Sequence, residues 1–225
     1  MKRFINLSKI ESLAIYPEVV FNATRLLEIS RLAGESKDYG IATSLSILSS
    51  EEFVKAFVLF LHGIGIDIYA IKEVKGVFSK HKTKHEISTL IEILNLVQTI
   101  FAKNINKGNT PFGTKPNLLK SALTLLVKAA LNIGPIIELS TNLSWWGKAD
   151  TLKNKGLYVD YLDTLVLPKN ITEENFTEAY KISQELHEKI DIIKSHYENL
   201  TVIKRENLIK DINDGILFHN TVSKK

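Results

Sequence analysis

The chain has 225 residues, is 44% hydrophobic and 24% charged, and carries a formal net charge of +4. These values exclude a disordered chain and allow one domain with a sizeable core. Because the sequence contains no Cys, disulfides, thiolate metal sites and cysteine nucleophiles are excluded. The lack of Cys also fits a reducing compartment, so we expect a cytoplasmic protein.

The most hydrophobic stretch, residues 53–71, contains Lys55, His62 and Asp67. Ionisable side chains are costly inside a bilayer, so a buried core helix is the better interpretation of this stretch. Polar residues also interrupt the first dozen positions, where a signal peptide would need an apolar run. We expect neither a signal peptide nor contact with a membrane.

Apolar residues recur at helical spacing along most of the chain. The predicted helices span residues 17–33, 38–62, 66–77, 81–103, 117–145, 172–200 and 203–217. Pro17 is expected in the first turn of the first helix, and Gly134-Pro135 should kink the fifth. Residues 176–200 form a narrow apolar seam, which should pack against a partner helix of the same chain or of another.

Residues 148–169 differ from the rest of the chain. Residues 157–161 alternate with period two, which predicts an extended segment or a small hairpin. After Pro168, Thr172 is a predicted N-cap for the next helix. The sequence therefore predicts a single all-α domain over residues 1–225, with its core at 17–200. Its architecture should be a bundle of five to seven helices with a short extended segment near 157–161.

Three charged residues interrupt the apolar second helix: Glu51, Glu52 and Lys55. Glu51 and Lys55 have the i, i+4 spacing of a helical ion pair. Glu52 falls in the apolar stripe, so it should be buried with a partner. Candidate partners are Arg25, Lys84 and His81. Two interpretations remain open, a polar network that keeps the helices in register and a catalytic role.

A basic junction, residues 80–85, lies before the next predicted helix. His81 and His85 are four residues apart, so a helix would place both on one side. Metal-independent RNA cleavage needs a base, an acid and cations for the phosphorane charge, and this junction carries all three types of group. The alternative is an exposed helix start with no chemistry. No third ligand accompanies the two histidines, so we expect neither a metal nor a cofactor.

Four segments in this order resemble the AbiV family of bacterial abortive-infection proteins, which belongs to the HEPN group of helical domains. They are Asn22-Ala-Thr-Arg25-Leu-Leu, Ser50-Glu-Glu-Phe-Val-Lys55-Ala, Phe78-Ser-Lys-His81-Lys-Thr-Lys84 and Lys155-Gly-Leu-Tyr158-Val-Asp160-Tyr followed by Pro168. The resemblance covers about residues 17–170. It implies a HEPN-like helical fold, phage defence, a homodimer, and by analogy RNA cleavage or interference with translation.

The sequence departs from the nuclease members of the HEPN group at one point. Those members carry an Arg followed four to six residues later by a His at a dimer interface. No Arg precedes any of the six His of this chain at that spacing. Lys80 and His85 are among the nearest substitutes, but Lys cannot reproduce the guanidinium fork. Ribonuclease activity is therefore an analogy, and whether the protein is an enzyme stays open.

Three groups of candidate site residues follow. The candidate catalytic residues are His81, Lys84, Glu52 and His85. The candidate RNA-binding residues are Lys80, Lys82, Lys155 and Tyr158. The candidate structural polar network consists of Arg25, Glu51, Lys55 and Asp160.

Two functions are consistent with these residues. The first is an antiphage effector that blocks phage propagation by interfering with translation or cleaving RNA, once a phage-encoded protein activates it. The second is a non-catalytic protein that sequesters a phage or translation component. The expected partners are a second copy of the chain, a phage-encoded activator, and RNA or the translation machinery.

Overall fold

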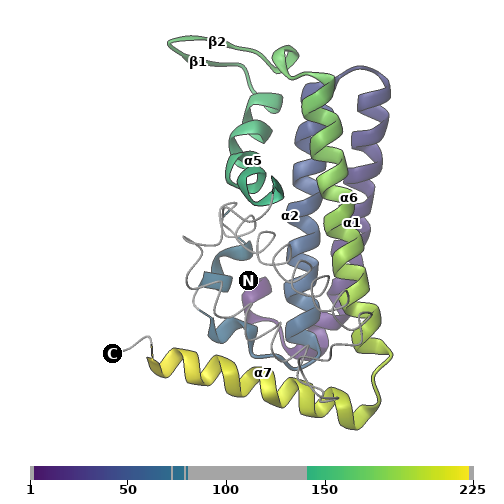
Figure 1. Ribbon diagram of the computed structural model, residues 1–225, viewed down its shortest axis with the longest axis vertical. Coiled ribbons are helices and arrows are strands. Elements are labelled where there is room, and N and C mark those ends of the chain that lie inside the picture. Colours follow the sequence, from purple (N-terminus) through teal and green to yellow (C-terminus); the bar gives the residue numbers. More distant parts are fainter. Residues whose placement is uncertain (1–2, 72, 79, 81–140, 223–225) are drawn as a thin grey trace, which may run out of the picture.

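The computed structural model describes residues 3–71, 73–78, 80 and 141–222 (Figure 1). This part of the chain forms five α-helices, several short 3-10 turns and one two-stranded hairpin. The all-α prediction is therefore confirmed. The predicted helix at 81–103 and most of the one at 117–145 lie outside the described residues.

The first two helices form an antiparallel pair, α1 (Lys9–Glu35) and α2 (Tyr39–Gly63). The helix α1 begins eight residues earlier than predicted, because Ser8 and Glu11 form a reciprocal capping box. Pro17 therefore lies inside the helix, and its predicted place in the first turn was wrong. By contrast, α2 begins where predicted, since the Asp38 side chain accepts a hydrogen bond from the Ile41 N–H.

Two 3-10 turns, η2 (Ile68–Ala70) and η3 (Glu73–Phe78), replace the short helix predicted at 66–77. Gly65 precedes them with a φ of 106°, a conformation that favours glycine. The C-terminal helix α7 (Val202–Val222) is tied to this turn by Asn213. The Asn213 amide donates to the Gly65 carbonyl at 3.1 Å and accepts from the Asp67 N–H at 2.8 Å.

The helix α5 (Thr141–Leu157) leads into a hairpin of β1 (Asp160–Leu162) and β2 (Thr164–Val166). The strands are antiparallel, with Asp160 opposite Val166 and Asp163 at the turn. A hairpin was one of the two predicted forms, but residues 148–157 are helical and were wrongly assigned to the irregular stretch. After η5 (Pro168–Asn170), Thr172 caps α6 (Glu173–Glu198) as predicted, in a capping box with Asn175.

The central element is α2, which contacts α1 and α6 on one side and α5 on another (Figure 1). The predicted seam of α6 packs on α2 within the same chain, through Ala179, Ile182, Leu186 and Ile190. The helix α7 crosses one end of this bundle, and the hairpin projects from the other.

Serines allow α2 to pack closely on its neighbours. Ser30 of α1 donates to the Ala42 carbonyl at 2.7 Å, and Ser49 of α2 donates to the Ala23 carbonyl at 2.7 Å. On the other side, Ser183 of α6 donates to the Ser46 carbonyl at 2.9 Å. Small side chains bring the backbones near one another, and each hydroxyl is satisfied by a carbonyl of the partner helix. The first half of α2 is thus buried without being strongly apolar.

Candidate functional site

A buried ion pair joins α2 to α5. The ammonium Nζ of Lys153 lies 2.8 Å from Oε1 of Glu51, and the two side chains are 4% and 1% exposed. Lys153 Nζ also lies 2.8 Å from Oδ1 of Asp150, an ion-pair contact without the alignment of a hydrogen bond. Two carboxylates therefore offset the cost of placing this ammonium inside the protein.

The backbones of α2 and α5 approach closely beside this ion pair. Ser44 donates a hydrogen bond to the Lys153 carbonyl at 2.8 Å. A Cβ at Gly156 would collide with Ser44 Oγ and with the carbonyl oxygen of Gly40. Because glycine has no Cβ to fill this space, the last turn of α5 can pack closely against the first turns of α2.

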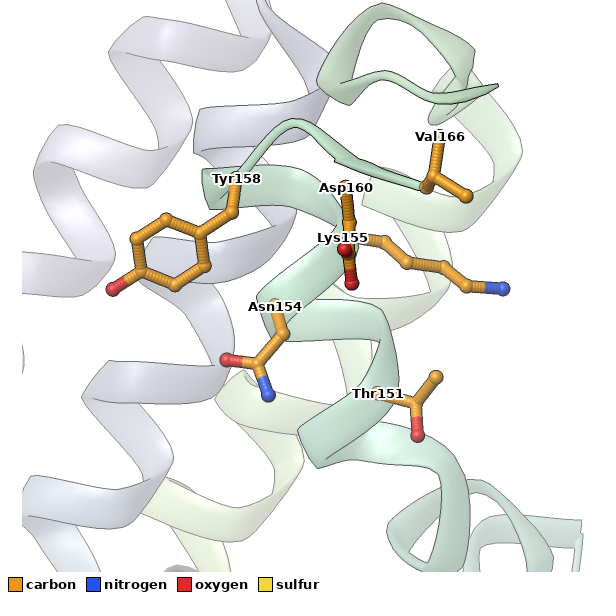
Figure 2. A pocket seen from close by; sticks show the side chains of 6 residues that line it. All are labelled: Thr151, Asn154, Lys155, Tyr158, Asp160 and Val166. Carbon is orange, nitrogen blue, oxygen red and sulfur yellow. The ribbon is translucent and has the colours of Figure 1, made fainter. Parts of the chain in front are cut away.

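The opposite face of α5 contributes to a pocket. Residues at i, i+3, i+4 and i+7 share a helix face, so the last two turns of α5 and Tyr158, which follows its last residue, present four side chains together. The hairpin adds a cross-strand pair from β1 and β2. The pocket has a volume of about 230 Å³ and is lined by Thr151, Asn154, Lys155, Tyr158, Asp160 and Val166 (Figure 2).

The lining of this pocket is chemically mixed. Tyr158 is 61% exposed, and its backbone N–H donates to the Asn154 carbonyl at 3.0 Å. Asp160 is exposed as well, and its Oδ1 accepts from the Tyr161 N–H at 2.8 Å. Figure 2 shows the side chains of Tyr158 and Lys155 leaving the backbone in opposite directions. The pocket thus offers an aromatic face, an ammonium, an amide and a carboxylate within two turns of helix and one hairpin.

The polar residues predicted on α2 are arranged differently from the prediction. Glu51, and not Glu52, is the buried acid, and its described partner is Lys153 of α5. Lys55 pairs with Glu52 at i, i+3 and not with Glu51. These two side chains are 16% and 21% exposed. Glu52 was predicted to be buried with a partner, but it is partly exposed and pairs with Lys55, because the buried face of α2 includes its serines, which turns Glu51 inward.

The other members of the predicted network lie apart from this ion pair. Arg25 is exposed on α1 and Asp160 is exposed on the hairpin, so neither is part of the buried cluster. Lys80 is exposed, and its N–H donates to the Gly76 carbonyl at 2.7 Å. The remaining predicted residues of the basic junction lie outside the described residues: His81, Lys82, Lys84 and His85.

Comparison with known proteins places this arrangement in a family. The family model for AbiV, one of the HEPN domains, matches residues 11–188. The chain belongs to the AbiV family. The match includes the buried ion pair, the pocket and most of α6. Searches of curated proteins and of solved structures found no significant match.

Among the described histidines of this AbiV chain, the one with the larger pKa shift was not selected by the sequence analysis. His187 of α6 stacks on Phe53 with ring centroids 3.9 Å apart. Burial lowers the pKa of His187 to about 4, so the ring is neutral at physiological pH. Its Nε2 lies 3.1 Å from Ser49 Oγ. Since that hydroxyl already donates to Ala23, the ring nitrogen is the donor in this contact.

Two further properties of the AbiV chain concern its described part alone. Residues 3–71, 73–78, 80 and 141–222 contain no group of three or more His, Cys, Asp or Glu placed to hold a metal ion. Over the same ranges, no helix combines the length and hydrophobicity that a bilayer span requires.

Sequence reasoning missed Lys153 and Gly156 of the candidate site, as well as the pocket residues Thr151, Asn154 and Val166. Trp146, Ala149, Lys153 and Gly156 recur at helical spacing and are all buried. This pattern would have placed Lys153 on the inner face of a helix, had residues 148–157 been recognised as helical. The inner face of α5 anchors the segment, and the outer face, with the hairpin, carries the groups that can contact a ligand.

Proposed function

We propose that this protein acts in abortive infection in the bacterial cytoplasm, where it blocks phage propagation by arresting translation. Its activity is released by a phage-encoded protein and acts on RNA. The observation that carries the proposal is the AbiV family match over residues 11–188, since this family is one of abortive-infection proteins.

RNA cleavage is the form of arrest that the basic junction supports. His81 and His85 supply the base and the acid, and Lys84 stabilises the charge of the phosphorane. Glu52 orients the junction, while Lys80, Lys82, Lys155 and Tyr158 bind the RNA. No metal or cofactor is required for this chemistry, because the 2′-hydroxyl of RNA is the nucleophile.

A second candidate function is a non-catalytic one, in which the protein sequesters a phage or translation component. The exposed hairpin favours it. Val159 is 65% exposed, Tyr161 72% and Leu165 55%, so three large hydrophobic side chains are presented to solvent on one small element. Exposed apolar groups of this kind mark surfaces that bind other macromolecules.

Cell-free translation of a reporter mRNA separates the two functions. The purified protein is added with lysate from phage-infected or uninfected cells, and both reporter synthesis and mRNA length are measured. We expect translation to stop only with the infected lysate and the full chain, accompanied by shortened RNA. The His81→Ala and Lys84→Ala variants should then leave the RNA intact, whereas Lys204→Ala, an exposed lysine on α7, should behave as wild type.

Each remaining outcome has a defined meaning. Arrested translation with intact RNA would favour sequestration over cleavage. Unimpaired translation under all conditions, with a folded protein, would contradict both RNA cleavage and the sequestration of a translation component.

A further inference from the structure

The pocket beside Tyr158 is held in place by the buried face of α5. Lys153 and Gly156 lie on the buried face of α5 and fix this helix on α2. Thr151, Asn154 and Lys155 are their neighbours in sequence, but they lie on the outer face of the helix and line the pocket. Three of the six lining residues are therefore built on a rigid element, while Tyr158 follows the last residue of α5 directly and Asp160 and Val166 come from the hairpin. Groups on such an element keep their relative positions without a ligand.

The size of the pocket limits what it can enclose. Its volume of about 230 Å³ lies below the roughly 300–1,000 Å³ of pockets that enclose drug-sized ligands. One planar ring system would fit, and the rest of a larger molecule would remain outside. A single base of an unpaired nucleotide is small enough for this volume, and its sugar and phosphate would then lie on the rim.

Tyr158 and Lys155 supply the two interactions that single-stranded nucleic acids need. An exposed aromatic ring stacks on a base whatever its identity, and a lysine nearby neutralises the phosphate. The two side chains leave the backbone in opposite directions (Figure 2). The Lys155 ammonium therefore lies across the pocket from the Tyr158 ring, where it can contact the phosphate of a neighbouring nucleotide.

Asp160 makes the pocket selective among bases. A carboxylate accepts hydrogen bonds and donates none, so it favours a base edge that presents N–H groups. Guanine presents two adjacent N–H groups, N1–H and the N2 amino group, which one carboxylate can accept together. The Tyr161 N–H holds Oδ1 of Asp160 at 2.8 Å and orients the carboxylate. Asn154 offers both a donor and an acceptor to the remaining edge.

We propose that this pocket binds one unpaired guanine base of single-stranded RNA. Tyr158 stacks on the base, Asp160 accepts from its N–H edge and Lys155 contacts the adjoining phosphate. The inference rests on the proposed function insofar as it makes RNA the molecule on which the protein acts. It adds the base preference and the residues that produce it.

Fluorescence anisotropy with the full chain tests this site. The probes are labelled RNA octamers, one of uridines alone and one with a single guanosine at its centre. We expect the guanosine octamer to bind about 5-fold more tightly or better. Asp160→Asn should reduce this preference, because the amide keeps only one acceptor oxygen and its NH2 group faces one of the two N–H groups of guanine. Tyr158→Ala should weaken the binding of both octamers.

Two matched controls are available on the same elements. Tyr161→Ala removes an exposed tyrosine that does not line the pocket and keeps the N–H that orients Asp160. Lys148→Ala removes an exposed lysine of α5 two turns from Lys155. Both variants should bind as wild type, and the thermal melting curves of all four should match because every substituted side chain is exposed.

Equal affinity for the two octamers, or an unchanged preference in Asp160→Asn, would overturn the inference. Tighter binding of a labelled hexaglutamate peptide than of the guanosine octamer would also overturn the inference, because the pocket would then prefer an acidic peptide to RNA. The translation assay keeps this failure separate from that of the proposed function. Arrested translation without a guanine preference would contradict the guanine site alone. A guanine preference without arrested translation would contradict the proposed function alone.

Discussion

Lys153 and Glu51 are 102 residues apart in sequence, and their charged groups meet at 2.8 Å inside the protein. The neighbouring Ser50 donates to Ser183 of α6 at 2.8 Å. Two consecutive residues of α2 therefore bind two different helices. Ser50 and Glu51 belong to one of the segments that resemble the AbiV family. Their contacts set the positions of α5 and α6 around α2, and the position of α5 in turn sets that of the pocket.

The buried ion pair should be costly to break and less costly to remove entirely. Lys153→Met leaves Glu51 buried without this ammonium, and we expect a loss of about 3–5 kcal/mol in the free energy of unfolding. The double variant Glu51→Leu with Lys153→Met removes both charges and should be more stable than the single variant. Urea unfolding measures the free energy of unfolding of the single and of the double variant.

Lys148→Met on the exposed face of α5 is the control, with an expected change within about 0.5 kcal/mol. A double variant at least as unstable as Lys153→Met would show that the stability does not depend on charge pairing.

The two glycines of α5 should respond to alanine in opposite directions. Gly156→Ala forces a Cβ into Ser44 Oγ and the Gly40 carbonyl, and should destabilise the protein by about 1–3 kcal/mol. Gly147 has nothing within 4 Å of its Cβ position, so Gly147→Ala should stabilise the helix by about 0.5–1 kcal/mol. Thermal denaturation of the two variants compares them directly, and a shift of the same sign in both would refute close packing at Gly156.

The sequence predicted the helices best where capping residues and apolar spacing agree. Asp38 and Thr172 mark the starts of α2 and α6, and both helices were placed within a few residues. Pro17 misled the prediction, because proline is favoured in a first turn, whereas the capping box of Ser8 and Glu11 starts α1 earlier and leaves Pro17 inside the helix on an exposed face.

The site was harder to predict than the fold for two physical reasons. Hydrophobic spacing selected Glu52 as the inward acid, since buried serines such as Ser46 and Ser49 do not register as apolar. Ser49 donates to the Ala23 carbonyl and Ser46 Oγ lies 2.6 Å from Ser30 Oγ, and this pairing with α1 depends on tertiary structure. Lys153 was missed because its segment, with two glycines and several polar residues, has a weak helical pattern. Only the contact with Glu51 shows that its ammonium is inside.

A homodimer, which the family resemblance led us to expect, needs a surface other than α6, whose seam packs within the chain. The outer face of α1 is such a surface. Ile10 is 81% and Phe21 67% exposed, and Ala14 and Pro17 lie exposed between them on the same side of the helix. Two copies of α1 crossing antiparallel would set each Ile10 against the partner's Phe21, the self-complementary contact of a two-fold axis. Light scattering should report twice the 25.4 kDa chain mass.

Phe21→Glu should convert this dimer to a monomer, because it places two carboxylates in the contact. Ile192→Glu, at a residue of α6 that is 58% exposed, should leave it a dimer. A wild-type protein that stays monomeric at micromolar concentration would contradict the prediction.

The neutral state of His187 should make stability fall in mild acid. Its pKa is about 4 in the folded protein and 6.5 in the unfolded chain, so the unfolded chain binds the extra proton between these values. This contribution to stability is complete above pH 6.5 and is lost as the pH falls toward 4. One pKa unit corresponds to about 1.4 kcal/mol, which gives a loss of about 2–3 kcal/mol between pH 7.5 and pH 4.5.

Comparison with His187→Gln isolates this contribution, because both proteins share every other titrating group. Urea unfolding at the two pH values should show a loss smaller by about 2–3 kcal/mol in the variant. His62→Gln serves as the control. Burial lowers the pKa of His62 as well, but its ring is less buried and lies 3.0 Å from Ser12 Oγ at the other end of α2. The His62→Gln substitution should therefore reduce the loss of stability in acid by less than His187→Gln does. If wild type and His187→Gln lost stability equally, the ring would not be held neutral by its burial against Phe53.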